Sequence, residues 1–341
     1  MCFDTTASNT GQMKGACTLL EKQLGKSLLY LACRHILEVV LRSVFEYKIG
    51  STTAPQPDIF RRFQIHWPNI DQPKYIEGVQ DDSVKKSVKE FEKEVSEFLL
   101  FQLTEKQPRD DYLELIKLCL IFLGKVPSHD VSFNTPGAYH HARWMAKAIY
   151  FLKMFIFREQ FSMSEEEFSS LKAICLFIVN LYVKMWCQAS NAISAPSNDL
   201  QFVQNVIKYR RIDQGVSDKV LGKYLLHLWY LNPELICLSL FDKNVSNEIK
   251  SKMAKKILSY SNLTEEERSS RIMRVQVSED EAVNLFKNIS LQNFVLDQSL
   301  AFFEYFKVKT DFLTEDPKKW SESKDFLKLQ RCRVVQREGL S

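Results

Sequence analysis

Glycine and proline are scarce in this chain, with only 10 of each among 341 residues. A fold of many short strands needs frequent turns, so this scarcity favours helices. The common catalytic patterns are also missing: the sequence holds no P-loop, no HExxH and no GxGxxG, and we recognise no Ser/His/Asp triad. These absences argue against the nucleotide-binding, metalloprotease and dinucleotide-binding classes that those patterns define.

The eight cysteines do not form CxxC pairs, and several lie within apolar runs that have helical spacing. Paired spacing is typical of zinc sites and of disulfide frameworks. Scattered cysteines in apolar surroundings are more typical of free thiols in a reducing compartment. We therefore expect an intracellular protein with neither a zinc site nor a disulfide framework.

Long uninterrupted apolar runs are lacking as well. The longest, residues 173–187, is broken by Asn180 and Lys184, and the N-terminus carries no signal-peptide pattern. The sequence therefore predicts no membrane span. Apolar residues still make up 45% of the chain, which is enough for a buried core. The net charge of +4 permits a DNA partner without requiring one.

The N-terminal stretch has a different pattern from the helical remainder. Residues 1–4 and 28–33 are short apolar runs, with a Ser/Thr/Asn/Gly loop and a helical pattern between them. Asp4 ends the first run, and residues 36–47 are spaced like an amphipathic helix. A carboxylate that leaves a strand into such a loop is well placed to hold a metal ion and a phosphate oxygen. As the structural alternative, Asp4 caps the loop that follows it.

Three segments together resemble one family. They are 4–11 (DTTASNTG), 31–35 (LACRH) and 136–144 (PGAYHHARW), and their order is similar to that in hAT-like, transposon-encoded transposases. The resemblance implies an RNase H-like catalytic core that is interrupted by a large helical insertion. It also implies a DNA partner, a nuclear location, and a metal site of two aspartates and one glutamate that binds Mg²⁺ or Mn²⁺.

Within this resemblance, Asp4 matches the second aspartate, and Arg143 with Trp144 matches an Arg-Trp pair of the insertion. Cys33 and His35 match a Cys-x-x-His motif imperfectly, because the histidine comes one residue early. The family's first aspartate lies upstream of the position matched by Asp4, and its late glutamate has no convincing match here. We therefore expect Asp4 to be a remnant that binds metal weakly if at all, and Mg²⁺ or Mn²⁺ to matter only if some activity remains.

The expected fold is mostly α. A partial RNase H-like α/β unit occupies residues 1–50, a helical insertion domain residues 51–310, and a C-terminal segment with a basic tail residues 311–341. The strand at residues 1–4 would lack its family partner, so it would stay unpaired, fray, or pair with residues 28–32 alone.

Two groups of residues are candidates for DNA contact. Trp144 could stack on an extruded base while Arg143 holds the adjacent phosphate, as the resemblance implies; alternatively, Trp144 packs in a core and Arg143 forms a local ion pair. Arg268, Arg271 and Arg274 recur every three residues, which predicts a charged stripe on a helix. Such a stripe is more often a solvated face than a DNA footprint.

Three hypotheses follow. The first is a transposase-derived fragment that is inactive in strand cleavage and transfer, with DNA binding retained at best. The second is a helical protein–protein interaction module without a nucleic-acid role. The third is an active nuclease, which requires a carboxylate partner near Asp4. The sequence leaves the oligomeric state open.

Overall fold

The computed structural model describes residues 2–11, 14–50, 58–125, 131–137 and 144–331. Helix makes up 65% and strand 1% of the structure, which confirms the mostly α expectation. The chain forms two compact units. Unit 1 comprises residues 1–36, 188–207 and 224–341, and unit 2 comprises residues 37–187 and 208–223. The boundary predicted at residue 50 therefore falls inside unit 2, and residues 224–310 group with the N-terminal segment.

Unit 1 holds the two strands that the structure describes and the short helices around them. Its elements are β1 (Cys2–Phe3), α1 (Ala7–Thr10), α2 (Ala16–Leu24), β2 (Leu31–Ala32), most of α11 (Ala195–Tyr209), α13 (Asn247–Leu258), α14 (Glu279–Leu285), α15 (Leu300–Tyr305) and α16 (Lys324–Arg331). Single-turn and two-turn 3-10 helices connect them, including η7 (Leu225–His227), η8 (Leu235–Phe241), η9 (Glu265–Glu267), η10 (Leu291–Phe294), η11 (Asp297–Ser299), η12 (Asp311–Thr314) and η13 (Pro317–Glu322).

Strands β1 and β2 pair in parallel, with Cys2 opposite Leu31 and Phe3 opposite Ala32. Of the three outcomes expected for the first strand, pairing with residues 28–32 is therefore confirmed. A parallel pair needs a crossover connection, which α1 and α2 provide. Gly25 ends α2 in the left-handed region at φ 60°, where glycine has no steric penalty.

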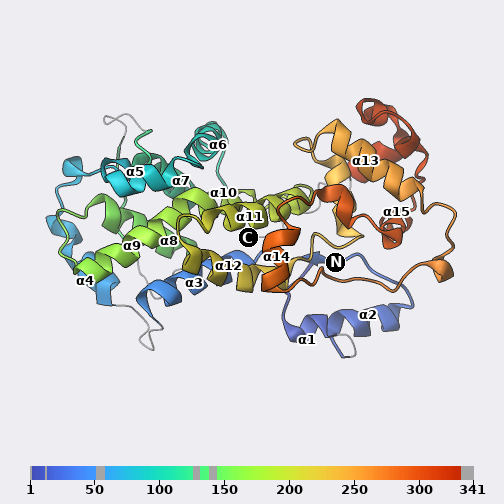
Figure 1. Ribbon diagram of the computed structural model, residues 1–341, viewed down its shortest axis with the longest axis horizontal. Coiled ribbons are helices and arrows are strands. Elements are labelled where there is room, and N and C mark those ends of the chain that lie inside the picture. Colours follow the sequence, from blue (N-terminus) through green and yellow to red (C-terminus); the bar gives the residue numbers. More distant parts are fainter. Residues whose placement is uncertain (1, 12–13, 51–57, 126–130, 138–143, 332–341) are drawn as a thin grey trace. The chain divides into compact units, whose positions relative to one another are not determined.

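Unit 2 is built from helices. They are α3 (Ile36–Ile49), α4 (Asp58–His66), α5 (Asp82–Val88), α6 (Glu92–Thr104), α7 (Asp110–Phe122), α8 (Trp144–Ile156), α9 (Glu165–Phe177), α10 (Val183–Gln188) and α12 (Gln214–Tyr224), with 3-10 turns η1 (Trp67–Asn69), η2 (Gln72–Lys74) and η3 (Gly78–Gln80). Figure 1 shows α7, α8 and α9 side by side. Helix α8 is apolar on most sides and is buried from residue 148 to residue 156, and the ring of Phe151 lies 5.0 Å from that of Phe60 and 5.6 Å from that of Phe45.

Helices α9 and α10 are joined by a π-helical turn, η6 (Ile178–Tyr182). The continuous run Glu165–Gln188 is long and apolar enough to cross a membrane, contrary to the expectation that Asn180 and Lys184 interrupt it too strongly. Within the structure, 67% of its most apolar window is buried, as in a core helix. A capping box opens this run: the Ser164 hydroxyl accepts a hydrogen bond from the backbone N–H of Glu167, and the Glu167 carboxylate accepts one from the backbone N–H of Ser164.

Candidate functional site at the ends of the parallel strands

The carboxyl ends of β1 and β2 lie at one edge, as they must in a parallel pair. The backbone N–H of Cys33 donates to the carbonyl of Phe3 over 2.9 Å, which holds the chain after β2 against the end of β1. Asp4, directly after β1, is exposed. Its backbone carbonyl accepts a hydrogen bond from the Asn9 side chain over 3.0 Å and so closes the following loop. Ligands of open α/β sheets bind outside such strand ends, which makes this edge the candidate site.

His227, from a distant part of the unit 1 sequence, also lies at this edge. The hydroxyl of Thr5 lies 3.3 Å from Nδ1 of His227, which ends η7. The pKa of His227 is lowered to about 4, mainly by burial, with Arg274 and His35 acting in the same direction and Asp4 opposing them. His227 is therefore a neutral imidazole at neutral pH, and the charged side chains of Arg274 and Asp4 both act on it.

An aromatic cluster supports the site from the buried side. The ring of Phe3 lies 5.6 Å from Tyr30 and 5.4 Å from Trp229, both in edge-on geometry. The hydroxyl of Tyr230 donates to the carbonyl of Ala32 over 2.8 Å, and that of Tyr30 donates to the carbonyl of Cys17 over 2.8 Å. Two short strands alone are only marginally stable. These buried rings, whose hydroxyls are hydrogen-bonded, supply the packing that holds both strands in place.

The donors at this edge do not fit a Mg²⁺ or Mn²⁺ ion. Both ions prefer several oxygen ligands, usually with more than one carboxylate in a two-metal site. Among the charged groups that act on the neighbouring His227, Asp4 is a carboxylate, whereas the others are His35 and the Arg274 guanidinium. In the part of the chain that the structure describes, no group of three or more His, Cys, Asp or Glu side chains could hold a metal ion.

The predicted helical stripe of Arg268, Arg271 and Arg274 is wrong. The capping box at Thr264 is present, but it opens only the single turn η9, and residues 268–278 have no helix. Neighbouring elements bind this backbone instead: Ser269 N–H donates to the Asp297 carboxylate over 2.6 Å, and the Met273 carbonyl accepts from the Asn232 side chain over 2.9 Å.

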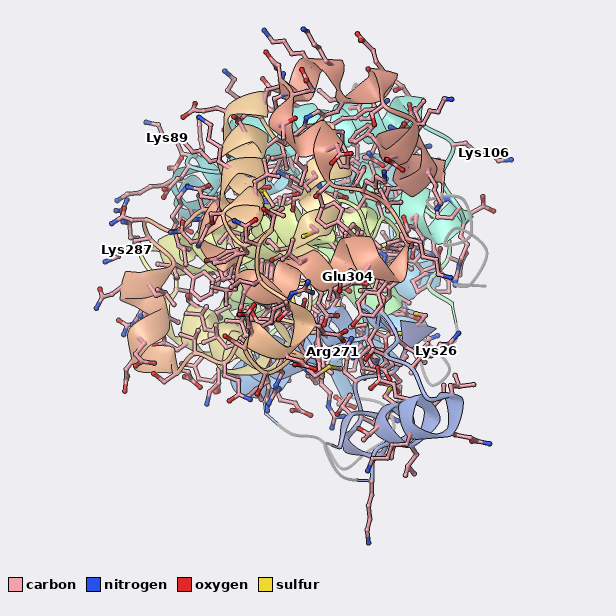
Figure 2. The ribbon with its side chains drawn as sticks, turned by 90° about the vertical axis from the view of Figure 1, so that its right-hand side faces the viewer. Lys26, Lys89, Lys106, Arg271, Lys287 and Glu304 are labelled. Carbon is pink, nitrogen blue, oxygen red and sulfur yellow. The ribbon has the colours of Figure 1, made fainter. Side chains whose placement is uncertain are left out.

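The guanidinium groups of Arg268 and Arg271 are each held by carboxylates. Arg268 binds both oxygens of Glu304, over 2.9 and 2.6 Å. Arg271 bonds to Glu21 over 2.8 Å and to the buried Glu234 over 2.6 Å, and it lies 5.1 Å above the Tyr30 ring. Figure 2 shows Arg271 beside the N-terminal segments, whereas Lys287 extends outward.

Arg274 differs from both. Its guanidinium donates to the backbone carbonyl of Leu226 and lies 5.9 Å from the centre of the Trp229 ring. A neutral carbonyl and an aromatic face leave the positive charge of Arg274 in place, whereas a carboxylate would compensate it. Of the three predicted arginines, Arg274 is therefore the one that contributes charge to the strand-end site.

The second predicted DNA-contact group cannot be placed in full. Trp144 is the first residue of α8. The structure does not describe the side chain of Trp144, nor the residues Arg143, His140 and His141. Stacking by Trp144 therefore stays a prediction.

Sequence reasoning missed His227, Trp229 and the buried pair of Arg34 and Asp199. Arg34 lies between the two residues of the supposed metal motif, and its Nη1 is 2.5 Å from Oδ1 of Asp199. The available signals were a histidine inside the apolar run 225–231 and an aspartate in the first half of an amphipathic helix. Neither pattern indicates which distant residue the side chain contacts in the folded protein.

Comparison with known proteins gives no match to a family model, a curated protein or a solved structure.

Proposed function

We propose that the protein derives from a hAT-like transposase and binds DNA in the nucleus without cutting it. The observation that carries this proposal is the parallel β1–α2–β2 unit with Asp4 directly after β1. This order of elements agrees with the second half of the metal-binding core that the sequence resemblance implies. The large helical remainder agrees with the implied insertion.

Binding without cleavage is supported by the side chains around Asp4. Strand cleavage by two metal ions needs several carboxylates that converge on ions about 4 Å apart. The charged groups that act on His227, which contacts Thr5 next to Asp4, are Asp4, His35 and Arg274, and Arg274 is a permanent cation. Such a set suits the contact of a phosphate more than that of a divalent metal ion.

Arg274 is the residue of unit 1 that we assign to the DNA backbone. Among the residues that the structure describes, no carboxylate bonds to it, and its own hydrogen bond to Leu226 fixes the guanidinium beside the Trp229 ring. Arg268 and Arg271 instead form ion pairs within unit 1, with Glu304 and Glu234 respectively. Arg143 and Trp144 remain assigned to a second contact, with a phosphate and an unpaired base, on the basis of the resemblance.

The experiment compares Arg274→Gln with Arg268→Gln as the matched control. Both variants lose one cation from the same segment, but only Arg274 is proposed to contact phosphate. We expect Arg274→Gln to reduce the slope of log affinity against log salt concentration by about 1 on any DNA sequence. Arg268→Gln should keep the wild-type slope. Equal slopes for all three proteins would remove Arg274 from the interface.

Catalysis is tested separately with a nicking assay on supercoiled DNA in Mg²⁺ or Mn²⁺. The proposal expects wild type and Asp4→Asn to be equally inactive. Metal-dependent nicking by wild type that Asp4→Asn abolishes would show a working metal site and would contradict the proposal.

A second candidate, a helical protein–protein interaction module, is favoured by one observation in unit 2. Near the end of α6, Phe101 is 58%, Leu100 45% and Leu103 36% exposed. Adjacent exposed apolar side chains are a feature of protein-binding faces. This candidate expects Phe101→Ser to abolish an association seen by sedimentation and expects DNA binding to be absent.

A further inference from the structure

Cys2 and Cys33 lie close together on one face of the strand pair. Side chains alternate along a strand, so Cys2 and Leu31 face opposite to Phe3 and Ala32, and Cys33 follows two residues after Leu31. Phe3 and Ala32 are buried, whereas Cys2 is exposed and Cys33 is half-buried. The two sulfur atoms are 3.5 Å apart.

We propose that Cys2 and Cys33 form a reversible dithiol–disulfide site that exchanges with small-molecule disulfides of the glutathione type. This inference rests on the strand register and on the sulfur positions, so it is independent of the DNA-binding proposal.

The exchange has two balanced steps. The Cys2 thiolate attacks one sulfur of the small disulfide, which forms a mixed disulfide at Cys2 and releases one thiolate. The Cys33 thiolate then attacks the Cys2 sulfur, which closes the Cys2–Cys33 bond and releases the second thiolate. The protein loses two electrons and two thiol protons, and one small disulfide is reduced to two thiols.

The environment of the two thiols sets the order of attack. The pKa of Cys33 is raised to about 11, mainly by burial, together with its hydrogen bond to Cys2 and the charge of Asp4. Cys2 is exposed and so meets the reagent first. Once the mixed disulfide has formed, Cys33 needs only a short movement to reach the Cys2 sulfur. The other cysteines of unit 1 that the structure describes, Cys17 and Cys237, are buried.

The bond would connect the strand that precedes Asp4 to the segment that leads to His35. Both residues belong to the strand-end site, so oxidation would fix the spacing of that edge. Under reducing conditions the two strands would be held by their backbone hydrogen bonds and aromatic contacts alone.

Peptide mapping after equilibration in glutathione buffers tests the proposal. Cys332 lies outside the described residues, so every protein in the series carries Cys332→Ser. Free thiols are blocked with N-ethylmaleimide, and the protein is cut with trypsin without reductant. Cleavage after Lys14, Lys26 and Arg34 leaves Cys2 in peptide 1–14 and Cys33 in peptide 27–34. We expect these two peptides to be joined by a disulfide.

Single variants separate the two steps. Cys33→Ser should trap the stable glutathione adduct on Cys2, because the second attack is lost. In Cys2→Ser, only Cys33 of the pair remains to react with glutathione disulfide. We expect this reaction to be about tenfold slower than the reaction of Cys2 in Cys33→Ser. The reason is that a raised pKa lowers the thiolate fraction more than it raises the nucleophilicity of the thiolate. Cys187→Ala, which removes a half-buried thiol of unit 2, should give the same linked peptides as the parent. Two results for the parent protein would overturn the proposal. One is a stable glutathione adduct on Cys2 while Cys33 is alkylated by the maleimide. The other is a Cys2 that glutathione does not modify.

Discussion

Arg34 and Asp199 form a buried ion pair in unit 1, with 2.5 Å between Nη1 of the guanidinium and Oδ1 of the carboxylate. The side chain of Asp199 is fully buried, and that of Arg34 is 11% exposed. The hydroxyl of Tyr224 donates to the same carboxylate oxygen over 2.8 Å, and the guanidinium lies 5.4 Å from the centre of the Tyr230 ring. The pair joins the segment after β2 to α11.

Removal of one partner should be costly because it leaves the other charge buried. We expect Arg34→Met to lower the free energy of unfolding by about 3–5 kcal/mol. The double variant Arg34→Met with Asp199→Leu should recover a large part of that loss, since it buries no charge. Urea titration of the three proteins measures both quantities. A loss below about 1 kcal/mol in the single variant would show that the pair is solvated.

His227 should make stability depend on pH. Burial lowers its folded-state pKa to about 4, below its ordinary value, so the unfolded chain binds a proton that the folded chain does not. The stabilisation is present above about pH 6.5 and is lost as the pH falls toward about 4. We expect a loss of about 2 kcal/mol over this window, allowing for partial exposure. His227→Gln should show a correspondingly smaller decrease in thermal unfolding curves, and identical decreases would contradict the assignment.

The two carboxylates that hold Arg271 should contribute unequally. The side chain of Glu234 is 4% exposed, whereas that of Glu21 is 24% exposed. Glu234→Ala should cost about 2–4 kcal/mol, because the guanidinium stays desolvated with fewer partners. Glu21→Ala should cost about 1 kcal/mol or less. The difference between the two unfolding midpoints in urea measures the ranking, and the reverse order would mean that Arg271 relies on Glu21.

Oxidation of Cys2 and Cys33 should stabilise unit 1. The two residues are 31 positions apart, and closing a loop of that length restricts the unfolded chain by about 3–4 kcal/mol. We expect the thermal transition of the oxidised protein to lie above that of the reduced protein, and Cys33→Ser to remove the difference. An oxidised protein that unfolds at a lower temperature would show that the bond strains the strands.

Local patterns in the sequence predicted much of the fold. The two short apolar runs became β1 and β2, the capping box at Ser164 opened α9, and scarce glycine and proline agreed with a mostly helical chain. These features depend on neighbours within a few positions, so a single sequence carries them.

The candidate site and the buried ion pairs of unit 1 depend on distant partners instead, and at the site Thr5 meets His227 across 222 positions. Arg34 meets Asp199 across 165 positions, and Arg271 meets Glu21 across 250. The spacing of Arg268, Arg271 and Arg274 matched a helix, but tertiary hydrogen bonds to Asp297 and Asn232 hold the segment outside a helix. No local pattern distinguishes such a segment from a solvated helix, because its conformation is decided by residues far along the chain.

If the protein binds DNA mainly through charge, its affinity for a hairpin DNA must depend on salt. We expect log affinity of the wild-type protein to fall linearly with log salt concentration, and Trp144→Ala to bind the hairpin more weakly at every salt concentration. No measurable binding at low salt, or an affinity that salt leaves unchanged, would show that the protein does not bind DNA in this way.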